Sequence, residues 1–319
     1  MASESIPLRG ISATDLMDKE FPEHKWAIPG ILPEGLNILG AKPKKGKSLF
    51  ALNIALAIAS GWLALGKIPV EQGSVLYFAL EDTQRRLQER MEVMLQGRKP
   101  PEKLFLYTQI PGMDEMGEVL LKKEMARYSD LRLVIIDTWA KFNPIMKGSA
   151  GNLYREDYKQ IGPMKELADT ARVSILLIHH LRKMEAEDIM DTFSGSLGLT
   201  GAADSLLVLA TEPMGQGPSY AVLHVTGRDV EANAFPLNFD NNTLSWLLAG
   251  EIREMKLTNQ QRLIVQACEK ETGPLSPTQI ANTSGLALQY VKNTLPKLIE
   301  NGNLKKSDRG EYEYNDIKI

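Results

Sequence analysis

The segment Ala41-Lys-Pro-Lys-Lys-Gly-Lys-Ser48 decides the fold of this chain, because it fits the phosphate-loop pattern that ends in Gly-Lys-Ser. The preceding residues, Leu36–Gly40, are predicted to form a short buried strand, and Leu49–Ser60, rich in Ala, Leu and Ile, a helix. A strand, a loop and a helix in this order are the context that the motif requires. The one departure is Ala41 where the pattern has glycine, although Gly40 is adjacent.

Such a loop surrounds phosphates with backbone N–H groups at a helix N-terminus, where negative charge is favoured. Lys47 would reach the β- and γ-phosphates of ATP, and the Ser48 hydroxyl would ligate Mg²⁺. The alternative is a basic turn that binds nothing. With ATP and Mg²⁺ as cofactors, the predicted nucleotide contacts are Ala41, Pro43, Gly46, Lys47, Ser48 and Leu49. Three further lysines, expected either to be solvated or to strengthen phosphate attraction, are Lys42, Lys44 and Lys45.

The composition is that of a globular protein: 319 residues, 43% hydrophobic and 24% charged, enough for about two domains. We expect no membrane span, because apolar stretches such as 49–65 are interrupted by polar residues and glycine. We expect a cytoplasmic location, because no secretory signal is visible. Cys268 is the only cysteine, which excludes a disulfide within the chain. The net charge of −3 argues against a uniformly basic nucleic-acid surface.

Apolar strands alternate with helices through the first two thirds of the chain. The strands are predicted over Leu36–Gly40, Ser74–Leu80, Leu104–Tyr107, Leu131–Ile136 and Val173–Ile178, and the helices over Leu49–Ser60, Thr83–Leu95, Glu115–Tyr128 and Asp157–Arg172. This alternation predicts an α/β fold, a mostly parallel sheet with helices on both faces. Four later strands are expected to extend the sheet as antiparallel hairpins: Ser205–Ala210, Tyr220–Thr226, Pro236–Phe239 and Leu244–Leu248.

We predict four regions: an N-terminal arm over 1–35 that packs onto the first strand, an α/β core over 36–248, a linker over 249–258 and a small domain over 259–319. The small domain is expected to contain helices Gln260–Glu271, Thr278–Thr283 and Leu288–Glu300, with Ser276 and Pro277 opening the second. Pro296 either kinks the third helix or ends it early. Asn303–Asn315 is predicted to be a hairpin carrying Lys305, Lys306 and Arg309, and the whole resembles a winged-helix module.

Two acidic positions follow apolar strands. Asp137 comes directly after its strand, as expected for the acid that holds Mg²⁺ through water in a phosphate-loop protein, although a helix cap is the alternative. Glu81 and Asp82 follow another strand, and Glu81 is predicted to orient and deprotonate the attacking water. The alternative is a capping pair for the helix at 83–95, with Asp82 as the cap.

Histidines and flexible residues follow the strand at 173–178. His179 and His180 end it, and a histidine there faces the crevice where ligands bind, so one could sense the γ-phosphate while the other is structural. Ser194-Gly-Ser196 lies in a small, polar stretch that is either an exposed loop or a mobile loop offering N–H and hydroxyl groups to the phosphates of a nucleic-acid strand. Arg228 is either a solvated charge or a residue that reaches a neighbouring subunit's nucleotide.

Together these motifs resemble the RecA-like ATPases, in particular ring helicases of the DnaB and plasmid RepA type, over residues 26–248. The resemblance implies roles for individual positions: catalytic glutamate Glu81, magnesium acid Asp137, γ-phosphate sensor His180, arginine finger Arg228, and a DNA-channel loop at Ser194, Gly195 and Ser196 with Lys183 before it. Relatives of the DnaB kind often carry a lysine two residues before the finger and Asn-Gly after it. Here Thr226 and Asp229-Val230 stand there.

The resemblance implies a Mg²⁺-ATP hydrolase that forms a hexameric ring and moves along single-stranded DNA, a replicative helicase of a plasmid or phage-like element. Two other functions stay open. One is a RecA/KaiC-type nucleic-acid-binding switch without unwinding. The other is a regulator whose C-terminal domain binds duplex DNA. The expected partner of the C-terminal domain is either duplex DNA or a replication protein.

Overall fold

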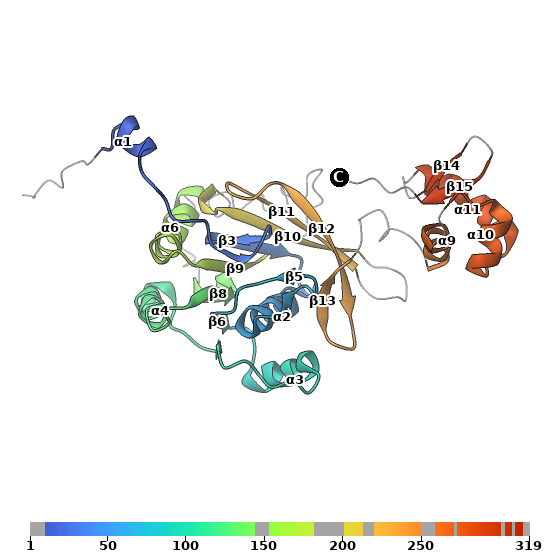
Figure 1. Ribbon diagram of the computed structural model, residues 1–319. Helices are drawn as coiled ribbons and strands as arrows, with labels where there is room; N and C mark the ends of the chain where they lie inside the picture. The colour runs from blue at the N-terminus through green and yellow to red at the C-terminus, as the bar shows by residue number, and fades with distance from the viewer. Residues whose placement is uncertain are drawn as a thin grey trace, which may run out of the picture.

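A nine-stranded sheet forms the centre of the computed structural model, which describes residues 10–143, 153–181, 201–212, 220–249, 259–270, 273–300, 304–307 and 310–314 (Figure 1). The strand order is β13-β12-β11-β10-β3-β9-β8-β6-β7. The strands are β3 (Gly35–Ala41), β6 (Ser74–Ala79), β7 (Leu104–Tyr107), β8 (Leu131–Asp137), β9 (Ser174–His180), β10 (Ser205–Glu212), β11 (Tyr220–Gly227), β12 (Asn233–Asp240) and β13 (Ser245–Leu248).

The sheet combines a parallel and an antiparallel part, which confirms the predicted fold class. From β7 to β10 every neighbouring pair is parallel. From β10 to β13 every neighbouring pair is antiparallel. Strand β10 therefore joins the two parts, because it pairs in parallel with β3 on one side and antiparallel with β11 on the other.

Helices cover both faces of the sheet (Figure 1). Side chains alternate across each strand, so Leu133 and Ile135 pack with α2 (Lys47–Ser60) and α3 (Gln84–Leu95), whereas Val134 and Ile136 face the opposite layer. That layer contains α4 (Gly117–Met125), α5 (Trp139–Phe142) and α6 (Leu153–Ala171). Helix α6 begins four residues before its predicted start and continues through Pro163.

The helix predicted over Glu115–Tyr128 is divided. A short 3-10 helix, η1 (Met113–Glu115), precedes α4, and Met116 between them has a left-handed backbone with φ of 74°. The turn is tight, because a Cβ on Gly117 would lie 2.3 Å from the carbonyl oxygen of Pro111. Only glycine therefore fits at position 117, and the left-handed Met116 interrupts the predicted helix.

The N-terminal arm packs onto the core through its second half. Helix α1 (Ala13–Met17) has no buried residue. The two-stranded sheet of β1 (Trp26–Ile28) and β2 (Leu32–Pro33) instead buries Ile28, Ile31 and Leu32 in the core on the α2 side. A second small sheet pairs β4 (Leu63–Ala64) with β5 (Ile68–Pro69) after α2. None of the helices in the described ranges is long and apolar enough to cross a membrane.

The C-terminal residues have their own hydrophobic cluster. They form α9 (Asn259–Lys270), α10 (Pro277–Ser284), α11 (Leu288–Glu300) and a hairpin of β14 (Leu304–Lys306) with β15 (Tyr312–Tyr314). Ser276 caps α10 in a capping box with Gln279, and Pro277 opens the helix as the sequence predicts. Helix α11 continues through Pro296 to Glu300, so of the two expectations for that proline the early end is wrong.

Candidate nucleotide site

The carboxyl ends of the parallel strands bring the predicted site residues to one edge of the sheet. Ala41 at the end of β3 pairs with His180 at the end of β9, and Ala79 at the end of β6 pairs with Asp137 at the end of β8. The loop from β3 to α2 and the turn from β6 to α3 start at this edge. In open sheets of this kind, ligands bind outside the carboxyl ends of the strands.

Residues 41–48 form the turn between β3 and α2 that the sequence predicts. Gly46 directly precedes α2 with a left-handed backbone, φ of 81°, which suits glycine. The Lys47 ammonium is buried and donates to the carbonyl oxygens of Ala41 at 2.8 Å and Lys42 at 3.1 Å. Burial lowers the pKa of Lys47 to about 8, although the nearby carboxylates of Asp137 and Glu81 act to raise it. A bound polyphosphate would favour the charged amine.

The extra lysines of the loop differ in exposure. Lys42 and Lys44 are exposed and Lys45 is half-buried, whereas Lys47 alone of the four is buried. Lys47 is thus the lysine that points into the loop.

Asp137 is buried beneath the loop and holds two hydroxyl groups. The Ser48 side chain hydrogen-bonds to it. The Tyr77 hydroxyl donates to its Oδ2 at 3.0 Å. Burial raises the pKa of Asp137, while these hydrogen bonds and Lys47 act to lower it. Burying a carboxylate is energetically unfavourable unless its charge is paired, so Asp137 is suited to binding a cation.

Glu81 is held between two side chains. The Thr138 hydroxyl donates to Oε1 of Glu81 at 3.0 Å, and Nε2 of His180 lies 3.6 Å from Oε2. The peptide bond between Asp137 and Thr138 is cis. Glu81 is about half exposed, so water can reach it. His180 also has a buried Nδ1 with no hydrogen-bond partner in the described part of the chain.

Asp82 does not cap the next helix, the role considered for it as an alternative. The cap of α3 is Thr83, whose side chain accepts from the backbone N–H of Arg86. Asp82 instead makes ion pairs with Arg86 and Arg90 on α3. The Asp82 carboxylate is therefore paired with α3. The Glu81 carboxylate lies near Lys47 of the phosphate loop instead.

The residues at this edge fit a Mg²⁺–nucleotide. A lysine and a helix N-terminus suit phosphates, and the hydroxyl of Ser48 with the carboxylate of Asp137 supplies the oxygen donors that Mg²⁺ prefers. The buried Asp137 is the observation that favours a cation here. When bound, the metal would neutralise developing charge on the phosphates. Lys47 would bind the phosphates, and Glu81 would orient water and accept its proton. His180 would donate a hydrogen bond to the γ-phosphate.

A family comparison agrees with this geometry. The family model described as an AAA domain matches residues 3–186, which is more than half of the chain. The chain belongs to the AAA domain family. No curated protein matches this member of the family by sequence.

Two solved structures resemble this AAA-domain chain. A DnaB-like replicative helicase, solved in a study of its interactions with primase, superimposes with a TM-score of 0.54 at 12% identity over 74% of this chain. The chain spans 66% of that helicase, just under two thirds. A KaiC-like protein from the hyperthermophilic archaeon Pyrococcus horikoshii gives a TM-score of 0.48 at 12% identity, covering 70% of this chain and 94% of that one. This AAA-domain chain therefore has a RecA-like fold with a phosphate loop.

Arg228 is the predicted site residue that the structure does not bring to this edge. It follows β11, which runs antiparallel to β10, so it lies beside the amino end of β3. Its guanidinium lies 3.7 Å from Asp204 and donates to the carbonyl oxygen of Gly201 at 3.0 Å. Asp204 also accepts the backbone N–H of Leu36 at 2.8 Å, which fixes this position against β3.

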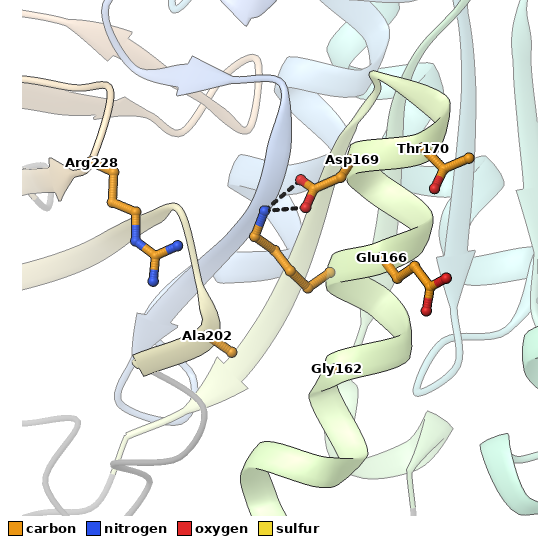
Figure 2. Close-up of a pocket in the computed structure, with 7 residues that line it drawn as sticks. Gly162, Glu166, Asp169, Thr170, Ala202 and Arg228 are labelled. Atoms are coloured by element: carbon orange, nitrogen blue, oxygen red, sulfur yellow. Dashed lines mark hydrogen bonds and ion pairs between the residues drawn. The ribbon is translucent and has the colours of Figure 1, made fainter. Parts of the chain in front are cut away.

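An open cavity of about 360 Å³ adjoins Arg228 and is lined on the other side by α6 (Figure 2). Lys165 on α6 projects toward it and pairs with Asp169 and Asp204. Two cationic side chains, Arg228 and Lys165, therefore line this cavity, each paired with a carboxylate. The nucleic-acid contacts predicted at Lys183, Ser194, Gly195 and Ser196 lie outside the described residues.

Three residues at the nucleotide edge were not predicted from the sequence: Tyr77, Thr138 and Trp246. Thr138 directly follows the predicted magnesium acid, so its position was a usable signal. Tyr77 stands in an apolar strand where its hydroxyl looks like core. Trp246 lies on β13, and its indole N–H donates to the carbonyl oxygen of Gly46 at 3.2 Å. Only the folded sheet reveals that contact.

Proposed function

We propose that this chain is a Mg²⁺-ATP hydrolase that assembles into a hexameric ring and moves single-stranded DNA through it, as a replicative helicase of a plasmid or phage-like element. The observation that carries the proposal is the division of the predicted site. Lys47, Asp137 and Glu81 lie at the carboxyl edge of the sheet, and Arg228 lies at the amino edge.

The two edges are too far apart for one chain to complete its own site. Strand β3 has seven residues, from Gly35 to Ala41. At roughly 3.3 Å per residue, its two ends are about 20 Å apart. Arg228 is held near the amino end through Asp204, which bonds to Leu36. It could therefore reach only the nucleotide of a neighbouring copy, as a head-to-tail ring requires.

A short path in the sequence connects the nucleotide edge to the proposed DNA loop. His180 ends β9 beside Glu81, and the segment with Lys183, Ser194, Gly195 and Ser196 follows directly. The described chain resumes at Gly201, whose carbonyl oxygen accepts from Arg228. We propose that hydrolysis sensed at His180 moves this loop along the DNA backbone.

A second candidate is a RecA/KaiC-type switch that hydrolyses ATP without unwinding, or a DNA-binding regulator. The observation that favours it is the partnering of Arg228 within its own chain by Asp204 and Gly201. For either candidate, we propose that 249–258 is a linker and that 259–319 is a winged-helix-like domain with duplex DNA or a replication protein as its partner.

The deciding experiment measures ATP hydrolysis with and without single-stranded DNA, displacement of a labelled strand from a fork, and particle mass with ATP. The motor requires DNA-stimulated hydrolysis, strand displacement and a hexamer. Lys47→Ala should lose the hydrolysis and the strand displacement but still form the hexamer. Lys67→Ala, which changes an exposed lysine after α2, is the matched control and should behave as wild type. Strong hydrolysis without displacement on any fork would favour the switch instead.

A further inference from the structure

Helices α10 and α11 form a helix-turn-helix within the C-terminal cluster. Only three residues, 285–287, connect them, and Gly285 ends α10 in a left-handed conformation with φ of 71°. A short turn containing glycine between two such helices is typical of the DNA-binding helix-turn-helix motif. Ile280 of α10 and Val291 of α11 are fully buried in the shared core, so the second helix is fixed against the first.

One face of α11 is polar and exposed. Val291, Leu295 and Leu298 face the core. The opposite positions carry two amides and two lysines, Gln289, Lys292, Asn293 and Lys297, and all four are exposed. Because residues three and four apart share a helix face, these four side chains form one continuous stripe, which we name the α11 stripe.

The sequence that contains the α11 stripe has few acidic residues, of which Glu300 ends α11. Between Pro277 and Ile299 the sequence has no aspartate or glutamate, in a chain with 40 of them. Strand β14 packs beside α11 and adds Lys305 and Lys306, of which Lys306 is exposed and Lys305 pairs with Glu313 across the hairpin. In a protein with a net charge of −3, this is a local cationic surface suited to phosphates.

The two amides of the α11 stripe are already aligned. The Nε2 of Gln289 donates to the Oδ1 of Asn293 at 3.0 Å. This bond leaves the Asn293 amide nitrogen as a donor and the Gln289 carbonyl oxygen as an acceptor. Side-chain amides recognise adenine in the major groove by pairing a donor and an acceptor with its N7 and N6 edge.

We propose that the α11 stripe binds double-stranded DNA in the major groove, with Gln289 and Asn293 contacting base edges and Lys292, Lys297 and Lys306 contacting phosphates. The proposal rests on the winged-helix-like domain proposed above for 259–319, and it deepens that proposal by assigning a sequence-selective duplex site to named residues of α11. A single strand lacks the groove that an α-helix fills, and the paired amides Gln289 and Asn293 offer the donor and acceptor that base edges in the major groove require.

The test uses the full chain. A random duplex library is selected on the protein, and the enriched duplex is titrated by fluorescence anisotropy at two salt concentrations, with unlabelled single strand as competitor. Gln289→Ala with Asn293→Ala should lower the preference for the enriched over a scrambled duplex by about five- to 100-fold. Lys292→Ala with Lys297→Ala should weaken binding to both duplexes and reduce the salt dependence by about two phosphate contacts.

Gln266→Ala with Lys270→Ala, at exposed positions of α9 outside the α11 stripe, is the matched control and should bind as wild type. Lys47→Ala should also retain duplex selection, which separates a failure of this proposal from a failure of the ATPase. If no duplex is enriched, or if the α11 stripe variants bind it unchanged, the proposal is wrong. If the α11 stripe variants lose binding to a purified replication protein but bind the duplex unchanged, the proposal is overturned in favour of a protein partner.

Discussion

The indole N–H of Trp246 donates a 3.2 Å hydrogen bond to the carbonyl oxygen of Gly46, 200 residues away in the sequence. The indole ring also fills the space beside Gly46, where a Cβ would lie 3.0 Å from it. Phe239 packs against the other side of the ring with centroids 4.9 Å apart. The antiparallel end of the sheet therefore supports the phosphate loop.

Replacing Trp246 with phenylalanine should weaken nucleotide binding. The change keeps much of the apolar packing but removes the donor to Gly46, at a cost of about 1 kcal/mol for a typical hydrogen bond. We expect the Kd for ADP to rise a few-fold, with a small loss of thermal stability. Isothermal titration measures the first and calorimetric unfolding the second. Trp62→Phe, at the far end of α2 where the ring stacks on Arg98, is the control and should leave the Kd unchanged.

Removing the Tyr77 hydroxyl should affect the metal more than the nucleotide. In Tyr77→Phe, Asp137 loses the donor 3.0 Å from its Oδ2 and is held by Ser48 alone. Ligands of a metal depend on such outer partners for their orientation, with losses of about 10- to 100-fold when these are removed. We expect hydrolysis to need a higher Mg²⁺ concentration, while binding of ADP without metal stays near wild type. An unchanged Mg²⁺ titration would contradict a role for Tyr77 in orienting Asp137.

Much of the fold could be predicted because apolar runs and turn residues mark the elements locally. The strand ends that carry Lys47, Asp137, Glu81 and His180 follow from the rule that parallel strands share a carboxyl edge. The structure places all four at that edge.

The rest depends on contacts between distant segments. Nothing near Trp246 indicates that it contacts Gly46, and the hydroxyl of Tyr77 is indistinguishable from core in an apolar strand. The alternative of a helix cap at Asp82 arose for a local reason. Either Asp82 or Thr83 can cap a helix, and only the ion pairs of Asp82 with α3 show that Thr83 does so.

Glu81→Gln should separate nucleotide binding from hydrolysis. The amide keeps the shape and can still contact Thr138, but it cannot accept a proton from water. General base catalysis contributes about 10²- to 10⁴-fold, so kcat should fall within that range while the Kd for ATP stays similar. Thr138→Val should lower kcat less, because Glu81 keeps its charge but loses the donor 3.0 Å from Oε1. Steady-state kinetics and nucleotide titrations measure both, and a Glu81→Gln enzyme with normal kcat would refute the assignment.

Mixing two inactive variants should restore hydrolysis if Arg228 acts on a neighbouring copy. Arg228→Ala leaves the phosphate loop intact, and Lys47→Ala leaves the arginine intact. In a mixed ring, some interfaces combine an intact loop with an intact arginine, so activity should return, up to about a quarter of wild type at equal amounts if the variants mix randomly. Arg228→Ala alone should lose about 10³-fold or more. Normal hydrolysis by that variant would show that Arg228 is only a partner of Asp204.

Cys268 should report the folding of the C-terminal unit by itself. It is the only cysteine, and it lies buried in α9. Burial raises the pKa of its thiol to about 11. Because the thiolate is the reactive form, a rise of about two pKa units slows thiol labelling at pH 8 by roughly 100-fold even before access is considered. Labelling should therefore be very slow in the folded chain and fast once α9 unfolds, which a thiol reagent at increasing urea measures.

The four tryptophans, at positions 26, 62, 139 and 246, lie outside 259–319, so their fluorescence reports the α/β core in the same titration. ADP at about 100 times its Kd should stabilise the core by roughly 2.7 kcal/mol. If the two units fold independently, ADP moves the tryptophan midpoint to higher urea and leaves the Cys268 labelling midpoint unchanged. A common shift of both midpoints would mean that the C-terminal unit unfolds together with the core, and the proposed boundary at 249–258 would be wrong.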